Sequence, residues 1–268
     1  WILGLILAFS ALLPSDARAG QTPQVQLADS LYAKGEYSKA AEAYFAIAQV
    51  DGVSAPLYFN MANAYAQSGD LGKAVLYYAR AHRLDPSDKE IRNNLNYFVS
   101  KVEDANRAEL RGKKTSVSPD PETFFGTAHR LIAEDVSSDT WAVAAVVAFI
   151  LFLGGVAVYL FCSNVTLRKG GFFGGICLFF LAIFFIVFSY MGASAYDNHD
   201  EAVLQAYKAQ LLIEPSEDAK PAASQLCQGT RFLIVAEETD VEGRPTWYKV
   251  RVNSSIEGWI PSSAIEII

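Results

Sequence analysis

The sequence predicts a multidomain membrane protein with α-helical repeats, a two-helix transmembrane hairpin and a small all-β barrel, in that order. Three observations lead to this fold class. A set of residues recurs 34 positions apart early in the chain, two uncharged stretches follow, and short runs of alternating apolar and polar residues fill the last part. Because the uncharged stretches separate the other two parts, the repeats and the barrel are expected to be separate small modules.

Two apolar stretches, at about residues 141–162 and 171–195, are each long enough to cross a bilayer, since about 20 helical residues span its hydrocarbon core. The link between them carries Arg168 and Lys169, whereas the outer flanks are acidic. Lys and Arg in short loops stay cytoplasmic, so residues 140–196 are predicted to form a hairpin whose two flanking domains lie together on the opposite side. Glycine pairs in both stretches favour close packing of the two helices on each other over a docking face for a partner.

The first residues are interpreted as a secretory signal peptide. Residues 1–19 contain an apolar run that is short for a membrane span, and Ala17-Arg18-Ala19 is typical of a small-x-small cleavage site. An uncleaved anchor is the alternative. In either case the segment that follows is predicted to be exported.

Residues 20–102 are predicted to form two helical repeats and a capping helix. The residues that define the repeat recur in pairs, Gly35 with Gly69, Ala40 with Ala74 and Tyr44 with Tyr78. A period of 34 is that of tetratricopeptide repeats, in which glycine lies at a helix turn, alanine at a close helix approach and tyrosine towards the next repeat. Pro86 is expected to end the second repeat, because proline cannot continue a helix. The stretch 89–99 is then the cap that stacked repeats need.

The first helix of each repeat is expected to line a groove that binds a partner. Offsets of 34 bring six side chains into two rows, Gln26, Asn60 and Asn94 in one, and Asp29, Asn63 and Tyr97 in the other. Asparagine has donor and acceptor atoms, so it can hold a peptide backbone without reading its sequence. The alternative is that some of these residues bond neighbouring helices or face water.

Residues 103–139 are predicted to be a helix tail and a linker, with an amphipathic helix at 123–133 lying in the membrane interface. Of the three cysteines, only Cys227 lies clear of the two spans, so no disulfide is expected between exported residues. Cys227 is interpreted as a small buried residue, with a redox sensor as the alternative.

After Asp200 the apolar pattern changes to a period of two. Short alternating runs separated by turn residues fill 200–268 and predict a small β-barrel. The stretch 257–265 resembles the closing strand and short helical turn of bacterial SH3-like domains. Trp247 and Trp259 could stack on a ligand, although packing in the core or at the rim is the expectation.

Composition and motifs point away from several functions. A net charge of −7 argues against nucleic acid as a partner. The sequence has no phosphate-binding glycine loop, no metal-ligand spacing and no nucleophile–base pair, so no enzyme, cofactor or metal is predicted. Neither apolar stretch contains a charged side chain, which argues against transport.

The segments 57–65, 69–78, 84–88 and 91–95 resemble BatE-type proteins of the Bacteroides aerotolerance operon, and the resemblance covers nearly the whole chain. The chain departs from that pattern at Met61, where leucine is common, and at Ala62, where glycine is usual. The resemblance implies a periplasm-facing scaffold of the bacterial inner membrane that acts in envelope and oxidative stress tolerance. It further implies assembly with membrane proteins carrying von Willebrand A domains, a BatD-like protein and, indirectly, a MoxR-type ATPase. The alternative is an envelope anchor whose barrel binds cell-wall peptide or glycan.

Overall fold

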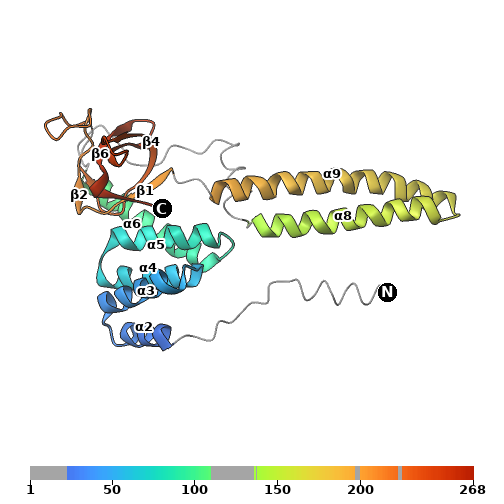
Figure 1. Cartoon of the computed structure of the whole chain (residues 1–268), viewed down its shortest axis with the longest axis horizontal. Coiled ribbons are helices and arrows are strands. Elements are labelled where there is room, and N and C mark those ends of the chain that lie inside the picture. Colours follow the sequence, from blue (N-terminus) through green and yellow to red (C-terminus); the bar gives the residue numbers. More distant parts are fainter. Residues whose placement is uncertain (1–22, 110–135, 137, 197–199, 223–224) are drawn as a thin grey trace.

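The computed structural model describes residues 23–109, 136, 138–196, 200–222 and 225–268 (Figure 1). Along the described residues, a stack of helices is followed by an antiparallel pair of long helices and then by a β-domain. The predicted signal peptide at 1–19 and the predicted interfacial helix at 123–133 lie outside the described residues.

The helical repeats form the first part of the fold. Their helices are α2 (Pro23–Ala33), α3 (Tyr37–Asp51), α4 (Ala55–Ser68), α5 (Leu71–Leu84) and α6 (Lys89–Glu109). Each helix packs against the next one along the chain, and Figure 1 shows them stacked from α2 to α6. α5 ends two residues before Pro86, as predicted. α6 continues ten residues beyond the expected cap at 89–99, because Val102 and Asn106 are buried in its second half.

The turns inside the two repeats have the same geometry. Gly35 and Gly69 have φ angles of 80° and 88°, in the left-handed region where a side chain would be strained. At each turn, the N–H groups of the glycine and of the next residue donate to carbonyls of the helix that has just ended. In the second repeat Asp70 then caps α5, since its Oδ1 accepts from the N–H of Lys73 at 3.1 Å. The predicted role of the two glycines is confirmed.

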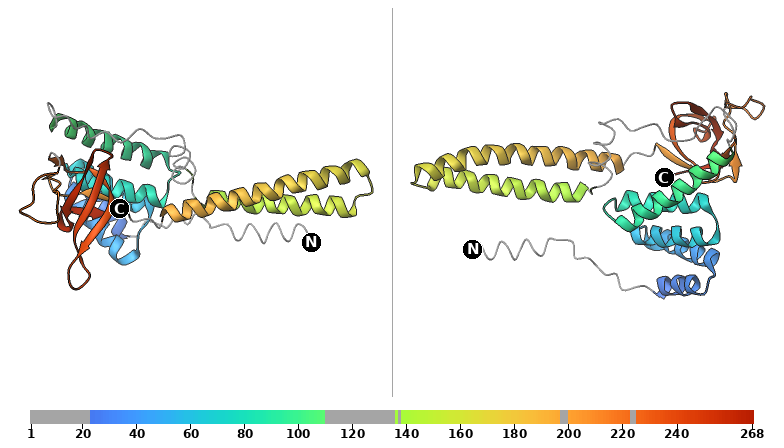
Figure 2. Two further views of the ribbon diagram at one scale, coloured as in Figure 1. Left: turned by 90° about the horizontal axis from the view of Figure 1, so that it is seen from above. Right: turned by 180° about the vertical axis from the view of Figure 1, so that it is seen from behind.

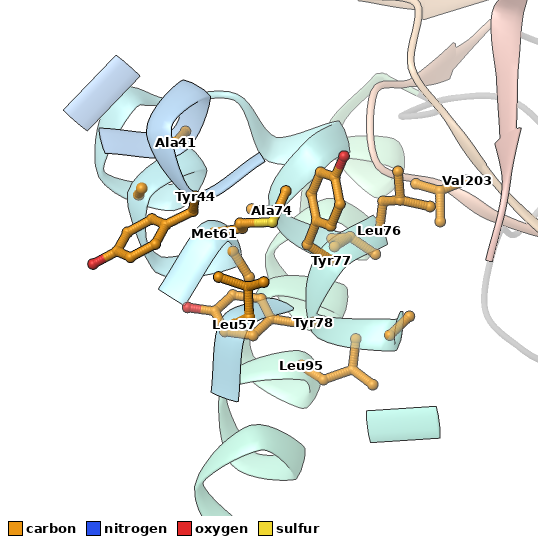
Figure 3. Close-up of a cluster of buried hydrophobic side chains, with 14 of the residues drawn as sticks. Ala41, Tyr44, Leu57, Met61, Ala74, Leu76, Tyr77, Tyr78, Leu95 and Val203 are labelled. Carbon is orange, nitrogen blue, oxygen red and sulfur yellow. The ribbon is translucent and has the colours of Figure 1, made fainter. Parts of the chain in front are cut away.

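Small and aromatic side chains fill the core of the repeats. Ala40 and Ala74 are completely buried, which lets the helices approach closely, and Tyr44 and Tyr78 are 2% exposed. Figure 3 shows Ala74, Tyr44 and Tyr78 around Met61, which is also fully buried. The two alanines are thus buried where the helices approach, and both tyrosines lie within the core of the repeats.

The two long helices are α8 (Ser138–Phe161) and α9 (Val165–Tyr196). They lie side by side in opposite directions (Figures 1 and 2), and by length and composition both are apolar enough to cross a membrane. α9 begins earlier than the span expected from residue 171. The reason is Asn164, whose Oδ1 accepts from the N–H groups of Thr166 and Leu167 and caps the helix.

Gly155 and Gly171 allow close contact between these helices. A β-carbon at Gly171 would lie 2.7 Å from the backbone oxygen of Gly155, and one at Gly155 would lie 3.0 Å from the backbone oxygen of Gly171. By contrast, a β-carbon at Gly154 or Gly174 would meet no atom within 4 Å. Gly155 and Gly171, unlike Gly154 and Gly174, therefore lie at the contact between the two helices.

The β-domain contains β1 (Glu201–Leu204), β2 (Lys208–Ala209), β3 (Leu226–Cys227), β4 (Arg231–Thr239), β5 (Pro245–Asn253), β6 (Ile256–Pro261), the short helix η1 (Ser262–Ala264) and β7 (Ile265–Ile267). Five strands form an antiparallel sheet in the order β6-β5-β4-β1-β7, and β2 pairs with β3. In register, Ala202 lies opposite Phe232 on β4 and Ile267 on β7. The antiparallel sheet fits the predicted β-domain, and η1 lies where the short helical turn was expected.

Candidate functional site

The six predicted groove residues lie on α2, α4 and α6, which are the first helices of the two repeats and the cap. Their exposure differs along the two rows. Gln26 and Tyr97 are exposed, whereas Asp29, Asn60, Asn63 and Asn94 are half-buried.

Two of the six residues take part in bonds within their own repeats. The hydroxyl of Tyr44 donates to Oδ1 of Asp29, and the hydroxyl of Tyr78 donates to Oδ1 of Asn63. The same bond thus recurs 34 positions later and ties the second helix of each repeat to the first. Burial raises the pKa of both tyrosine hydroxyls, so they remain protonated donors at neutral pH. Asp29 and Asn63 therefore follow the alternative given above, in which a predicted groove residue bonds a neighbouring helix.

Asn60 and Asn94 have no such role. Within the residues that the structure describes, neither side chain donates or accepts a hydrogen bond. Each is half-buried and keeps an amide NH₂ and a carbonyl oxygen for an outside group. They occupy equivalent positions, 34 residues apart, on α4 and α6.

Aromatic rings connect the helices beside these asparagines. The ring of Tyr78 stacks on Phe98 of α6 with centroids 5.4 Å apart, and it meets Phe59 of α4 edge-on at 5.9 Å. Tyr97 contacts Phe98 at 5.0 Å and is 60% exposed. Sequence reasoning missed Phe59 and Phe98, although Phe59 precedes Asn60 and Phe98 lies one helical turn after Asn94.

The β-domain is docked against α5 and α6. Val203 of β1 and Ile268 belong to the hydrophobic core of the repeats, and Figure 3 shows Val203 beside Leu76. Arg80 donates to the backbone oxygen of Ile267, and Arg83 Nη1 donates to that of Ile268 at 2.6 Å. The sequence predicted two separate modules, but these contacts join them into one unit.

Polar bonds extend this interface along α6. Nδ2 of Asn106 donates to Thr230 Oγ1 at 2.9 Å, and Oδ1 of Asn106 accepts from the N–H of Cys227 at 2.8 Å. Nearby, Lys208 Nζ lies 2.7 Å from Glu109 Oε2. One pattern in the sequence could have indicated this contact. Val102 and Asn106 are four residues apart, so both face the β-domain from one side of α6.

The remaining predicted residues lie in the β-domain. Cys227 is half-buried, and burial raises the pKa of its thiol, which leaves little reactive thiolate at neutral pH. Trp247 and Trp259 are also half-buried. Trp259 pairs with Lys249, two residues beyond Trp247 on β5, so the two tryptophans are diagonal neighbours on one face of the sheet.

Comparison with known proteins assigns a family to part of this site. No curated protein matches the chain. Residues 55–88 match the family described as the tetratricopeptide repeat. The matched residues cover α4 and α5 and include Asn60, Asn63 and the turn at Gly69. This part of the chain is thus a tetratricopeptide repeat, a non-catalytic fold that suggests a scaffold for protein–protein interaction.

Proposed function

We propose that this protein is a membrane-anchored, non-catalytic scaffold whose repeats hold an extended segment of a partner protein. The observation that carries the proposal is the pair Asn60 and Asn94. Both lie at equivalent places on the first-helix face, and neither uses its side-chain amide inside the described part of the chain. The exposed ring of Tyr97 offers an apolar contact next to them.

The hairpin supplies the anchor in this proposal. Because α8 and α9 are antiparallel, Ser138 and Tyr196 are at one end, and Arg168 and Lys169 are at the other. The cationic end is expected on the cytoplasmic side. The repeats and the β-domain, which we take to be an SH3-like barrel, then both face the periplasm from the inner membrane.

The short link between α9 and β1 keeps the repeats near the bilayer. Residues 197–200 alone connect α9 to β1, so the Cα atoms of Tyr196 and Glu201 are at most about 18 Å apart. The repeats are docked on that same β-domain. A partner segment in the groove would therefore lie close to the membrane. This supports the resemblance-based proposal of assembly with other Bat-type membrane proteins in envelope and oxidative stress tolerance.

The groove is tested by Asn60→Ala combined with Asn94→Ala, followed by capture of cross-linked partners from native membranes. The matched control is Glu42→Ala combined with Gln49→Ala, because both of these residues are exposed on α3, the second helix of the first repeat. We expect the groove variant to lose the captured protein and the control variant to keep it. Equal capture by both variants would contradict the proposal.

Orientation is tested separately with introduced cysteines, after Cys162, Cys177 and Cys227 are replaced by serine. Val241 lies fully exposed in the turn between β4 and β5, and Thr166 lies exposed at the opposite end of the hairpin. A membrane-impermeant maleimide added to the periplasmic side should label Val241→Cys and spare Thr166→Cys. The reverse pattern would overturn the proposed topology.

The second candidate is an envelope anchor that binds cell-wall peptide or glycan, and it is favoured by the two tryptophans on one face of the sheet. Deleting 200–268 would be a poor test, because it would remove Val203 and Ile268 from the repeat core. Trp247→Ala combined with Trp259→Ala avoids that damage. Loss of sedimentation with purified wall material, with the protein partner retained, would favour the anchor.

A further inference from the structure

The tip of the hairpin has a surface pocket that the proposed scaffold does not use. Its volume is about 260 Å³, and it lies at the end of α8 and the start of α9. Two cationic side chains and three aromatic rings contribute to its wall, which consists of Tyr159, Val165, Arg168, Lys169, Phe172 and Phe173.

In the described part of the chain, no acidic residue lies near the two cations at the tip of the hairpin, since Asp139 is at the far end of α8. Between Thr140 and Tyr196, Arg168 and Lys169 are the only charged residues in the sequence. Neither makes an ion pair with any residue that the structure describes. The pocket therefore has two positive charges that an anionic ligand could neutralise.

Arg168 is held in place without using up its donors. Its Nε donates to the backbone oxygen of Tyr159 at 3.2 Å, and its guanidinium carbon lies 5.4 Å from the centre of the Tyr159 ring. Within the described residues, its two Nη groups make no hydrogen bond. Those Nη groups have the fork geometry that binds phosphate oxygens in pairs.

The direction of α9 also favours an anion in this pocket. Arg168 and Lys169 lie within the first five residues of this helix, where its positive dipole end makes extra cations unfavourable. An anion beside them would be attracted by the dipole as well as by both side chains. Asn164 already accepts from two of the first N–H groups of the helix, so the cations supply most of the donors.

The apolar part of the pocket lies deeper along the helix. Phe172 is four residues after Arg168, which is about 6 Å along the axis. Phe172 and Phe173 are 45% and 65% exposed. In a hairpin that spans the bilayer, the cations would lie at the level of the lipid headgroups. The two rings would lie beside the part of the acyl chains that adjoins the headgroups.

We propose that this pocket binds the phosphate of an anionic phospholipid, with Arg168 and Lys169 on the phosphate and Phe172 and Phe173 against the acyl chains. This inference rests on the membrane hairpin of the proposed function, but it does not depend on what the repeats bind.

The test uses the full chain in detergent, with phosphatidylglycerol and phosphatidylcholine added in equal amounts and retained lipids counted by native mass spectrometry. We expect the unchanged protein to retain phosphatidylglycerol preferentially. Arg168→Gln combined with Lys169→Gln should reduce that retention about tenfold. Lys34→Gln combined with Lys89→Gln is the matched control, because it removes the same charge from exposed positions on the repeats and should change nothing.

Two further measurements separate the possible failures. Lys169→Gln alone leaves the bond from Arg168 to Tyr159 intact, and it should weaken retention severalfold even if the double variant misfolds. Millimolar inorganic phosphate should not displace the lipid; displacement would identify free phosphate as the ligand and overturn the lipid assignment. Carbonate extraction from membranes tests the hairpin separately. If the chain resists extraction but retains both lipids equally, only the lipid site is refuted. If carbonate extracts the chain, the membrane hairpin itself is refuted.

Discussion

Asn106 of α6 donates its side-chain N–H to the hydroxyl of Thr230, 124 positions later in the chain, at 2.9 Å. The same side chain accepts the N–H of Cys227 and is only 1% exposed. A buried amide whose donor and acceptor are both bound by the other domain holds the two domains in one arrangement. The repeats and the β-domain are therefore joined as one unit.

Replacing Asn106 should loosen this unit. In Asn106→Ala the Cys227 N–H loses its acceptor, and the Thr230 hydroxyl loses a donor but keeps its own bond to the Cys227 carbonyl. An unsatisfied buried polar group costs about 1–3 kcal/mol. We expect the free energy of unfolding in urea to fall by about 2 kcal/mol. Asp104→Ala changes an exposed residue of the same helix and should alter it by less than about 0.5 kcal/mol.

The ion pair between Glu201 and Arg231 should make stability depend on acidic pH. Burial raises the pKa of the Glu201 carboxyl, but the charge and the hydrogen bond of Arg231, together with the charges of Arg83 and His82, outweigh this and hold that pKa below its ordinary value of 4.5. A carboxyl whose pKa is lowered by folding stabilises the protein above its unfolded pKa and loses that effect as pH falls through the folded pKa. We expect the urea midpoint to drop below pH 4.5, and to drop less in Glu201→Gln. A pH profile unchanged by Glu201→Gln, and matching that of the exposed Glu242→Gln, would show that this pair contributes nothing.

Two glycines of α9 allow a matched test of the hairpin. Gly171→Ala places a β-carbon 2.7 Å from the Gly155 oxygen, whereas Gly174→Ala places one in open space. We expect Gly171→Ala to destabilise the helix pair by about 1–3 kcal/mol, as overpacking does, and Gly174→Ala to have almost no effect. Unfolding of the full chain in sodium dodecyl sulfate, followed by circular dichroism, measures both. Equal effects would mean that the two helices do not pack through Gly155 and Gly171.

Cys227 should behave as a structural residue. Since burial raises the pKa of its thiol, we expect slow reaction with maleimide at pH 7 in the folded protein and fast reaction after unfolding. Cells carrying Cys227→Ser should keep any oxidant response that the unchanged protein supports. Loss of that response would restore the redox-sensor alternative.

The sequence predicted the elements of this fold well, because each has a local pattern. The period of 34 gave the turns at Gly35 and Gly69 and the buried Ala40 and Ala74, and alternating residues gave the main strands. These features depend on neighbours along the chain, so one sequence is enough to find them.

The contact between the domains could not be predicted in the same way. Val203 lies in the apolar run Ala202–Leu204, in which every residue is buried. Such a run indicates a strand covered on both faces, but it does not say that the repeat core is what covers Val203. Arg80 and Arg83 resemble ordinary surface cations at the end of a helix, yet they bind the backbone of residues almost 190 positions away. Likewise, the recurring bonds to Asp29 and Asn63 require the positions of the Tyr44 and Tyr78 hydroxyls, which only the fold supplies.

The most direct test of the scaffold places a photo-cross-linking amino acid at Asn60 and, separately, at Gln49 on α3, in native membranes. We expect a discrete adduct with one membrane protein from position 60, weakened by Asn94→Ala, and none from position 49. No adduct from position 60, or the same adducts from both positions, would contradict a partner segment held between Asn60 and Asn94.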